Sequence, residues 1–262
     1  MGESRQNPEQ LPKSIQTDEE NRNKGHLKIF FGYAAGVGKT YAMLEAAHMA
    51  KQQGIDVVAG YVEPHACPKT AALLNGLEVL PTREVFYNGM ILDEFDIGMA
   101  LKRKPQLILV DELAHTNAEG CRHAKRYQDI KELLNAGIDV YTTVNVQHIE
   151  SLCDTVASIT EIVVRERIPD SIFDNADQVE LIDIEPQDLI NRLNTGNVYR
   201  QTQEKQAVEN FFTIENLTAL REISLRRCAD RVNILTENTR IKNHGDYHTG
   251  EHLSLIHISE PT

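Results

Sequence analysis

The sequence predicts an α/β fold, in which helices cover both faces of a parallel sheet and a helical extension follows at the C-terminus. Two observations predict it. Short apolar runs alternate with helical segments of about 10 to 15 residues between residues 27 and 194, as in βαβ units. Beyond residue 200, apolar residues recur mostly at steps of three or four, as in one long amphipathic helix.

The strands are expected where short apolar runs end at a glycine, a turn or an acidic residue. The apolar runs lie at residues 27–31, 55–62, 107–110, 138–144, 162–164 and 179–184. Asn88-Gly89 separates two further apolar triplets, which predicts a hairpin over residues 85–92 with a type I′ turn. The parallel sheet is therefore expected to carry a separate antiparallel hairpin.

The helices are expected where apolar residues have helical spacing between start and stop signals. Pro68 and Pro186 are typical first residues of a helix, whereas Gly54, Gly76 and Gly137 are typical stops. The expected helices cover residues 38–53, 68–75, 93–104, 123–135, 147–157, 186–194 and 214–235.

Composition limits the class of protein. The 262 residues suffice for one large or two small domains. The net charge of −12 argues against a general nucleic-acid partner, which would need a basic face. The four cysteines form no CxxC pair, which excludes a zinc ribbon and favours reduced cytoplasmic thiols. No apolar run approaches the ~18–20 residues of a membrane span, and the polar N-terminus does not resemble a signal peptide.

Four segments are expected along the chain. Residues 1–25 are polar and should form a disordered arm. Residues 26–200 should form the α/β domain, and residues 201–240 a helical extension or linker. Residues 241–262 should be a disordered or artefactual tail, because its last ten residues resemble a translated sequencing adapter.

A glycine-rich turn, residues 32–40, joins the first strand to the first helix. This is the context that a P-loop requires, and it predicts a P-loop NTPase-like sheet. The N–H groups of Gly36, Val37 and Gly38 can cradle phosphate, and Lys39 can add a positive charge. The Thr40 hydroxyl can ligate Mg²⁺. Tyr33 stands where the usual spacing has the first glycine. The sequence therefore predicts a phosphate-binding nucleotide site with Mg²⁺.

An acidic pair follows the apolar strand at residues 107–110. Asp111 at the end of a strand near a P-loop can hold Mg²⁺ through water, and Glu112 can orient an attacking water. The alternative is a solvated strand end. The zinc motif HExxH is excluded, because the segment ending at His115 lacks its first histidine.

Polar residues also follow the strand at residues 138–144. Asn145 can contact the terminal phosphate, since ligands bind at the carboxyl ends of parallel strands, or it can cap the next helix. Other residues expected at this edge are Glu63, Pro64, His65, Thr142, Thr143, Gln147 and the three histidines His115, His123 and His148. Arg122 and Arg126 could act in trans between two protomers, although arginines at a helix N-terminus usually face solvent.

Five segments of the chain resemble one family. They are residues 31–40, 109–117, 122–130, 142–148 and 219–227, and the resemblance covers roughly residues 25–233. The chain is similar there to the N-terminal cytoplasmic domain of the KdpD family, the osmosensitive potassium-channel sensor histidine kinases of bacteria. The longer glycine spacing is the family's own form. The resemblance implies ATP binding and a regulatory role over a kinase, in a parent held in the plasma membrane with this domain on its cytoplasmic side.

Two functions stay open at this point. The first is an ATP-binding sensory input domain of a two-component potassium or osmotic sensor kinase, which controls expression of a potassium-uptake system. Its expected partners are ATP, the remainder of the kinase and a second copy in a homodimer. The second is a free-standing P-loop ATPase or nucleotide-dependent transferase. The sequence shows no phosphoacceptor box and no kinase ATP lid, so we expect at most slow ATP hydrolysis and no labelling of its own histidines.

Overall fold

The computed structural model describes residues 24–63, 68–87, 89–194 and 211–243. The predicted N-terminal arm and C-terminal tail lie almost wholly outside these residues. The chain divides into two units, Met1–Ser224 and Leu225–Thr262, which are described separately.

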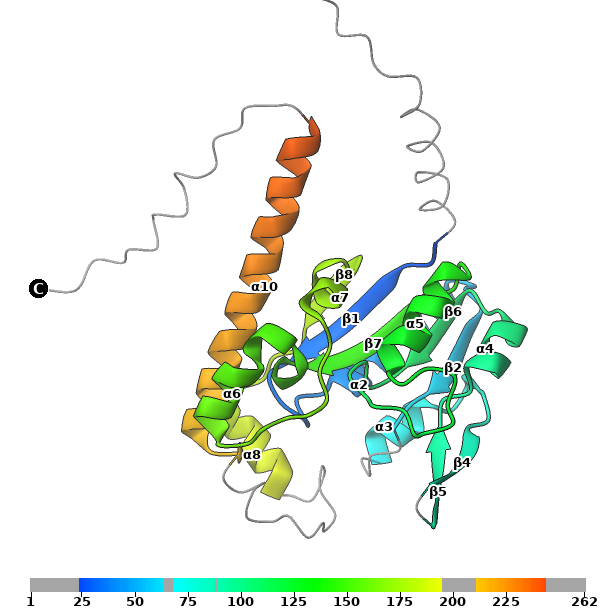
Figure 1. Cartoon of the computed structure of the whole chain (residues 1–262), viewed down its shortest axis with the longest axis horizontal. Coiled ribbons are helices and arrows are strands. Elements are labelled where there is room, and N and C mark those ends of the chain that lie inside the picture. Colours follow the sequence, from blue (N-terminus) through cyan, green and yellow to red (C-terminus); the bar gives the residue numbers. More distant parts are fainter. Residues whose placement is uncertain (1–23, 64–67, 88, 195–210, 244–262) are drawn as a thin grey trace, which may run out of the picture. The chain divides into compact units, whose positions relative to one another are not determined.

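The first unit is built on a six-stranded sheet in the order β3-β2-β6-β7-β1-β8, and every neighbouring pair is parallel (Figure 1). The strands are β1 (Leu27–Gly32), β2 (Val57–Tyr61), β3 (Glu78–Val79), β6 (Leu107–Val110), β7 (Asp139–Asn145) and β8 (Gln178–Leu181). The predicted α/β class is confirmed. The predicted strand at residues 162–164 is wrong: these residues join no strand, and Val163 is exposed.

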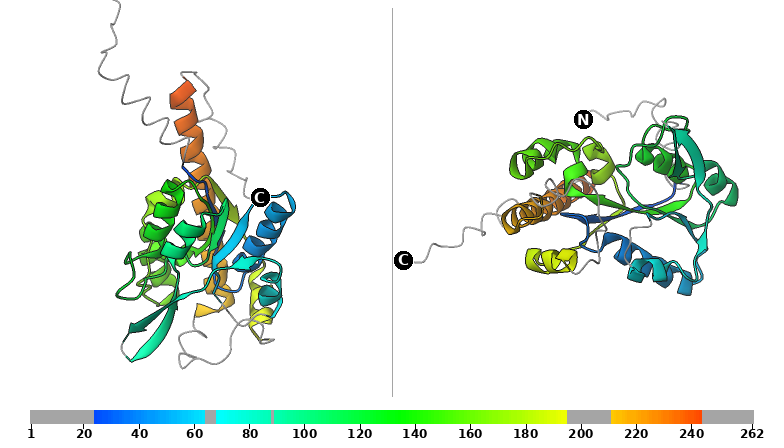
Figure 2. Two further views of the ribbon diagram at one scale, coloured as in Figure 1. Left: turned by 90° about the vertical axis from the view of Figure 1, so that its right-hand side faces the viewer. Right: turned by 90° about the horizontal axis from the view of Figure 1, so that it is seen from below.

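Helices cover both faces of this sheet. Figure 2 shows α2 (Lys39–Gln52) and α3 (Pro68–Leu73) on one face, and α5 (Arg126–Asn135) with α6 (Cys153–Thr160) on the other. The remaining elements are α4 (Ile97–Arg103), α7 (Asp170–Asp174), α8 (Pro186–Asn194) and two 3₁₀ turns, η1 (Val146–His148) and η2 (Glu150–Leu152). With helices on both faces the central strands lie inside the protein, and all four residues of β6 are buried.

The core beneath α2 explains why this helix docks where it does. Met43, Leu44 and Ala47 are fully buried and pack with Phe30 of β1 and Leu109 of β6. Burying side chains of this size stabilises a fold by about 1.5–3 kcal/mol each. This packing fixes the N-terminus of α2 at the carboxyl end of β1, next to the glycine-rich turn.

The predicted hairpin is present: β4 (Arg83–Tyr87) pairs with β5 (Met90–Glu94) in a separate two-stranded sheet, and Tyr87 pairs with Met90. The predicted type I′ turn includes Asn88, which lies outside the described residues. The hairpin projects from the unit in both figures. Because β5 extends to Glu94, the helix expected from residue 93 begins at Ile97, after Asp96 accepts the Met99 N–H at 2.9 Å.

Two other helices begin later than predicted. The helix expected at residues 123–135 begins at Arg126, because Lys125 is extended and pairs with Thr116 in an isolated bridge. The helix expected at residues 147–157 is divided into η1, η2 and α6, because Ile149 is extended and pairs with Ile168. Strand-like pairing therefore overrides helical spacing at both places.

The long C-terminal helix is α10 (Ile214–Asn243), which extends beyond the expected end at residue 235. In the first unit, α10 buries Leu217, Leu220 and Ser224. In the second unit it exposes Leu225, Val232 and Leu235. No helix among the described residues is both long and apolar enough to span a membrane.

Candidate functional site

The glycine-rich turn, residues 32–40, needs its glycines for geometric reasons. Gly36 and Gly38 have φ values of 86° and 112°, in the left-handed region that favours glycine. A Cβ added to Gly32 would lie only 2.7 Å from Val37 Cγ2 and 3.1 Å from Lys39 Cδ. The turn therefore folds back on the end of β1 at a distance that only a residue without a side chain permits.

Lys39 is the first residue of α2 and is buried. Its Nζ donates to the Ala34 carbonyl within the same turn at 3.0 Å. Burial lowers the pKa of Lys39 to about 8, although the negative charges of Asp111 and Glu112 act in the opposite direction. Within the described residues, the ammonium group therefore has one hydrogen bond and two nearby carboxylates, which is an incomplete environment for a buried cation.

Asp111 follows β6 and is 1% exposed, so a solvated strand end is excluded for this residue. The Thr40 hydroxyl donates to Asp111 Oδ2 at 3.0 Å, and the Thr143 hydroxyl donates to Oδ1. Burial raises the pKa of Asp111, while its bonds with Thr143 and Thr40 and the charge of Lys39 lower it. The hydroxyl of Thr40 and the carboxylate of Asp111 thus meet, and oxygen ligands of these types suit Mg²⁺.

Glu112 has a left-handed backbone, with a φ value of 58°. Its N–H donates to Asp111 Oδ1 at 3.1 Å, and the next N–H, of Leu113, donates to the Thr143 carbonyl at 3.0 Å. A residue other than glycine in this conformation costs of order 1–3 kcal/mol, and such strain is concentrated at functional sites. The neighbouring strand β7 therefore holds the acidic pair in a strained conformation.

Strand β7 lies between β1 and β6, so its end separates the glycine-rich turn from the acidic pair. Asn145 pairs with Gly32 across the sheet and makes no side-chain capping bond to η1, which excludes the capping alternative. Among the described residues, the buried oxygens Thr142 Oγ1, Asn145 Oδ1 and Gln147 Oε1 have no hydrogen-bond partner. Such groups are costly unless a ligand or water satisfies them.

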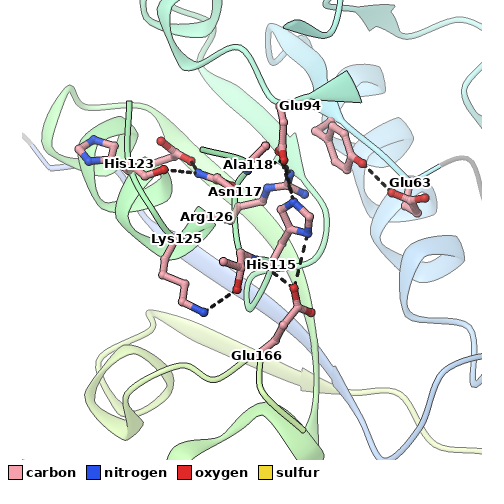
Figure 3. Close-up of polar contacts among 12 residues, drawn as sticks. Glu63, Glu94, His115, Asn117, Ala118, His123, Lys125, Arg126 and Glu166 are labelled. Atoms are coloured by element: carbon pink, nitrogen blue, oxygen red, sulfur yellow. Dashed lines mark hydrogen bonds and ion pairs between the residues drawn. The ribbon is translucent and has the colours of Figure 1, made fainter. Parts of the chain in front are cut away.

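Arg126 contacts the backbone of Asp111 and is completely buried, and Figure 3 shows its side chain beside Glu94. Its Nη1 donates to the Asp111 carbonyl and its Nη2 to Glu94, both at 3.2 Å, and its guanidinium lies 4.1 Å from the centre of the Tyr61 ring. A side chain held in this way cannot reach another protomer. Both alternatives given above are therefore wrong for Arg126, which neither faces solvent nor acts in trans, whereas Arg122 is half exposed and pairs with Glu132.

The three predicted histidines occupy different environments, and Figure 3 shows those of His115 and His123. His115 lies between Glu94 at 3.2 Å and Glu166 at 3.8 Å. His123 pairs with Glu132 at 2.8 Å. His148 Nδ1 lies 2.9 Å from the Glu166 carbonyl, and burial lowers its pKa. The charges of Lys39 and Glu112 also act on His148, and the His115 N–H donates to the Glu112 carbonyl at 3.0 Å, so both histidines lie near the site.

The remaining expected residues are divided between the structure and the segments outside it. Glu63 accepts a hydrogen bond from the Tyr61 hydroxyl at 2.6 Å (Figure 3). Pro64 and His65 lie outside the described residues.

Sequence reasoning gave no role to Tyr33, whose buried hydroxyl donates to the Ile184 carbonyl at 3.1 Å. Burial raises the pKa of this hydroxyl to about 12. Only its place within the turn could have drawn attention to it.

The described residues contain no cluster of three or more His, Cys, Asp or Glu side chains that could hold a metal ion. Thr40 and Asp111 supply only part of a coordination shell. Thr40 and Asp111 suit a Mg²⁺ ion whose other ligands are phosphate oxygens and water, because Mg²⁺ usually keeps several waters and takes few protein ligands.

Comparison with known proteins gives one consistent result. Residues 23–232 match the model of the KdpD family, the osmosensitive K⁺ channel His kinase sensor domain. A "Sensor protein KdpD" of Clostridium acetobutylicum is 60% identical over 237 residues, which cover 90% of this chain and 26% of that protein. The protein of the same name in Escherichia coli K12 is 57% identical over 210 residues, 80% of this chain and 24% of the relative.

A third relative, a "Putative sensor protein KdpD" of Synechocystis, is 48% identical over 225 residues, 86% of this chain and 61% of that protein. The chain therefore spans about a quarter of the length of the first two relatives and well over half of the third. Since the family model matches most of the chain, the protein belongs to the KdpD sensor-domain family.

Proposed function

We propose that this chain is an ATP-binding regulatory domain of a potassium-sensing two-component kinase. One observation carries the proposal: at the carboxyl ends of β1 and β6, the partly buried Thr40 donates to the buried Asp111, whose charge acts on the buried Lys39. The cluster combines a cation, a hydroxyl and a carboxylate beside a turn whose glycines expose backbone N–H groups. These are the groups that bind phosphate and magnesium in proteins.

Each residue has a defined part in the proposed site. The N–H groups of Gly36, Val37 and Gly38 would bind phosphate oxygens, and Lys39 would neutralise the outer phosphates. Thr40 and Asp111 would hold Mg²⁺, which balances phosphate charge when bound. The buried Asn145 Oδ1, which has no partner among the described residues, would face water bound at the terminal phosphate or at Mg²⁺.

Glu112 is the candidate to orient a water for hydrolysis, and its strained backbone supports that part. Arg126 is buried and Arg122 pairs with Glu132, so neither supports fast phosphoryl transfer. A site to which no arginine finger is supplied in trans hydrolyses nucleotide slowly, at about 10⁻⁴–10⁻² per second in comparable proteins. We therefore infer regulation by bound nucleotide, with hydrolysis at most slow.

The larger context is part of the proposal. Two relatives named as sensor proteins extend far beyond the segment that matches this chain. We infer that the domain belongs to a membrane-associated parent, faces the cytoplasm, and biases a kinase that controls potassium uptake. A second copy of the chain is a further expected partner.

Calorimetry with the Lys39→Ala variant tests nucleotide binding. Removing one charge-assisted contact costs about 1.5–3 kcal/mol, so Mg-ATP affinity should fall about ten- to a hundredfold. Lys102→Ala, which removes a lysine near the end of α4, is the matched control and should bind normally. Equal affinity in wild type and Lys39→Ala would contradict the assignment of the site. Turnover above about one per second would instead favour a free-standing ATPase or transferase.

A further inference from the structure

Arg192 lies beside the glycine-rich turn although 153 positions separate it from Lys39. A Cβ added to Gly38 would lie 4.0 Å from Arg192 Nη1. Arg192 belongs to the last turn of α8 and is exposed, whereas Lys39 is buried. Two cations thus flank the turn, one from inside the protein and one from the solvent side.

Several contacts fix α8 in this place. Strand β8 pairs with β1, and the Ile182 N–H donates to the Phe31 carbonyl at 2.7 Å. The Tyr33 hydroxyl reaches the Ile184 carbonyl, two residues before α8 begins. Figure 2 shows α8 on the same face of the sheet as α2. The position of Arg192 beside the turn therefore follows from contacts made by the turn itself.

The carboxylates on either side of Ile184 form ion pairs with a cation other than Arg192. Asp183 and Glu185 flank Ile184, and both pair with Arg221 of α10, at 2.7 Å and 2.8 Å. All these residues belong to the first unit. The ion pairs neutralise the two carboxylates, so that they oppose an anion at the turn less strongly.

We infer that Arg192 is a further phosphate-binding residue of the proposed nucleotide site. The inference rests on the proposed function and adds a residue to it. Gly38 is the N-cap of α2, where backbone N–H groups and the helix dipole favour an anion. A guanidinium at this position can donate two parallel hydrogen bonds to a phosphate, a geometry that lysine cannot reproduce. Arg192 therefore binds the phosphate chain from the solvent side, opposite Lys39.

The test compares Arg192→Ala and Arg192→Lys with wild type by calorimetry, using Mg-ATP and magnesium tripolyphosphate as probes. Arg192→Ala should weaken both probes about tenfold, because the lost contact is to phosphate and not to the base. Arg192→Lys should recover part of the loss. Thermal unfolding without ligand should change little, since the interactions of exposed charged side chains contribute little to stability. A large loss of ligand-free stability would indicate a structural role and overturn the inference.

Arg83→Ala is the matched control, because it removes the same charge from an exposed position on the hairpin. An equal loss of affinity in Arg83→Ala would show that the effect comes from the net charge of the protein, and it would overturn the inference. If Arg192→Ala binds like wild type while Lys39→Ala does not, Arg192 is excluded and the proposed function stands. If wild type binds neither probe, both proposals fail.

Discussion

Lys39 and Arg126 are both buried cations near Asp111, yet their surroundings differ. Arg126 has a buried carboxylate partner in Glu94, a second hydrogen bond to the Asp111 carbonyl and an aromatic ring against its face (Figure 3). Among the described residues, Lys39 has one hydrogen bond, to a carbonyl of its own turn, and burial lowers its pKa to about 8. Arg126 therefore has more protein partners than Lys39, although its Nε has none among the described residues.

The difference indicates different roles for the two charges. A buried ion with its partner in place holds elements together, and here Arg126 joins α5 to β5 and to the end of β6. A buried ion with an incomplete shell favours the arrival of an anion, because the anion supplies what the protein lacks. We therefore expect Arg126 to determine stability and Lys39 to determine binding.

The largest effect is expected from Arg126→Met. This change removes the guanidinium from the buried Glu94, which keeps only His115 and the Ala118 N–H as partners, and breaking a buried pair from one side costs about 3–5 kcal/mol. Chemical denaturation should show a loss of this size in the free energy of unfolding. Arg122→Met removes an exposed pair and should cost no more than about 1 kcal/mol. Equal losses in the two variants would contradict the expectation that the buried Arg126 contributes more to stability than the exposed Arg122.

The second prediction concerns the pH dependence of stability that Lys39 causes. Its pKa is about 8 in the folded protein and 10.5 when unperturbed. Between these values the unfolded chain binds more protons, so stability contributed by Lys39 rises with pH. Relative to Lys39→Met, wild type should gain about 2 kcal/mol between pH 8 and pH 10.

Denaturation of both proteins at pH 8 and pH 10 measures this difference directly. Lys39→Met should also be at least as stable as wild type at pH 7, because it buries no charge. A difference that stays constant across the range would show that Lys39 is as well satisfied as Arg126, and the comparison would fail.

The smallest effect is expected from Asp111→Asn, which tests the magnesium part of the site. The amide keeps an acceptor for the Thr40 hydroxyl but loses the charge. Affinity for ATP should fall about tenfold more with Mg²⁺ than with a chelator present, since Mg²⁺ prefers carboxylate oxygens. If affinity falls equally under both conditions, Asp111 has a structural role. Of Lys39 and Asp111, only Lys39 would then contribute its charge to ligand binding.

The sequence by itself determined the fold class, the hairpin, the glycine-rich turn and the acidic residue after β6. Local patterns carry all of these, because strand and helix periodicity and the conformational needs of glycine depend on neighbouring residues. Lys39, Thr40 and Asp111 were therefore identified as one candidate site before any contact was known. The family resemblance rested on the same local segments, and the match over residues 23–232 confirms it.

Only the tertiary structure decided which polar residues meet and which are buried. The position of β7 between β1 and β6 brings Thr143 to Asp111 and Asn145 to Gly32, and strand order has no local signal. The burial of Arg126 depends on Glu94 and Tyr61, which lie 32 and 65 positions away in the chain. Arg192 reaches the glycine-rich turn for the same reason: packing of distant segments sets the position of a charge, and a sequence pattern records only its neighbours.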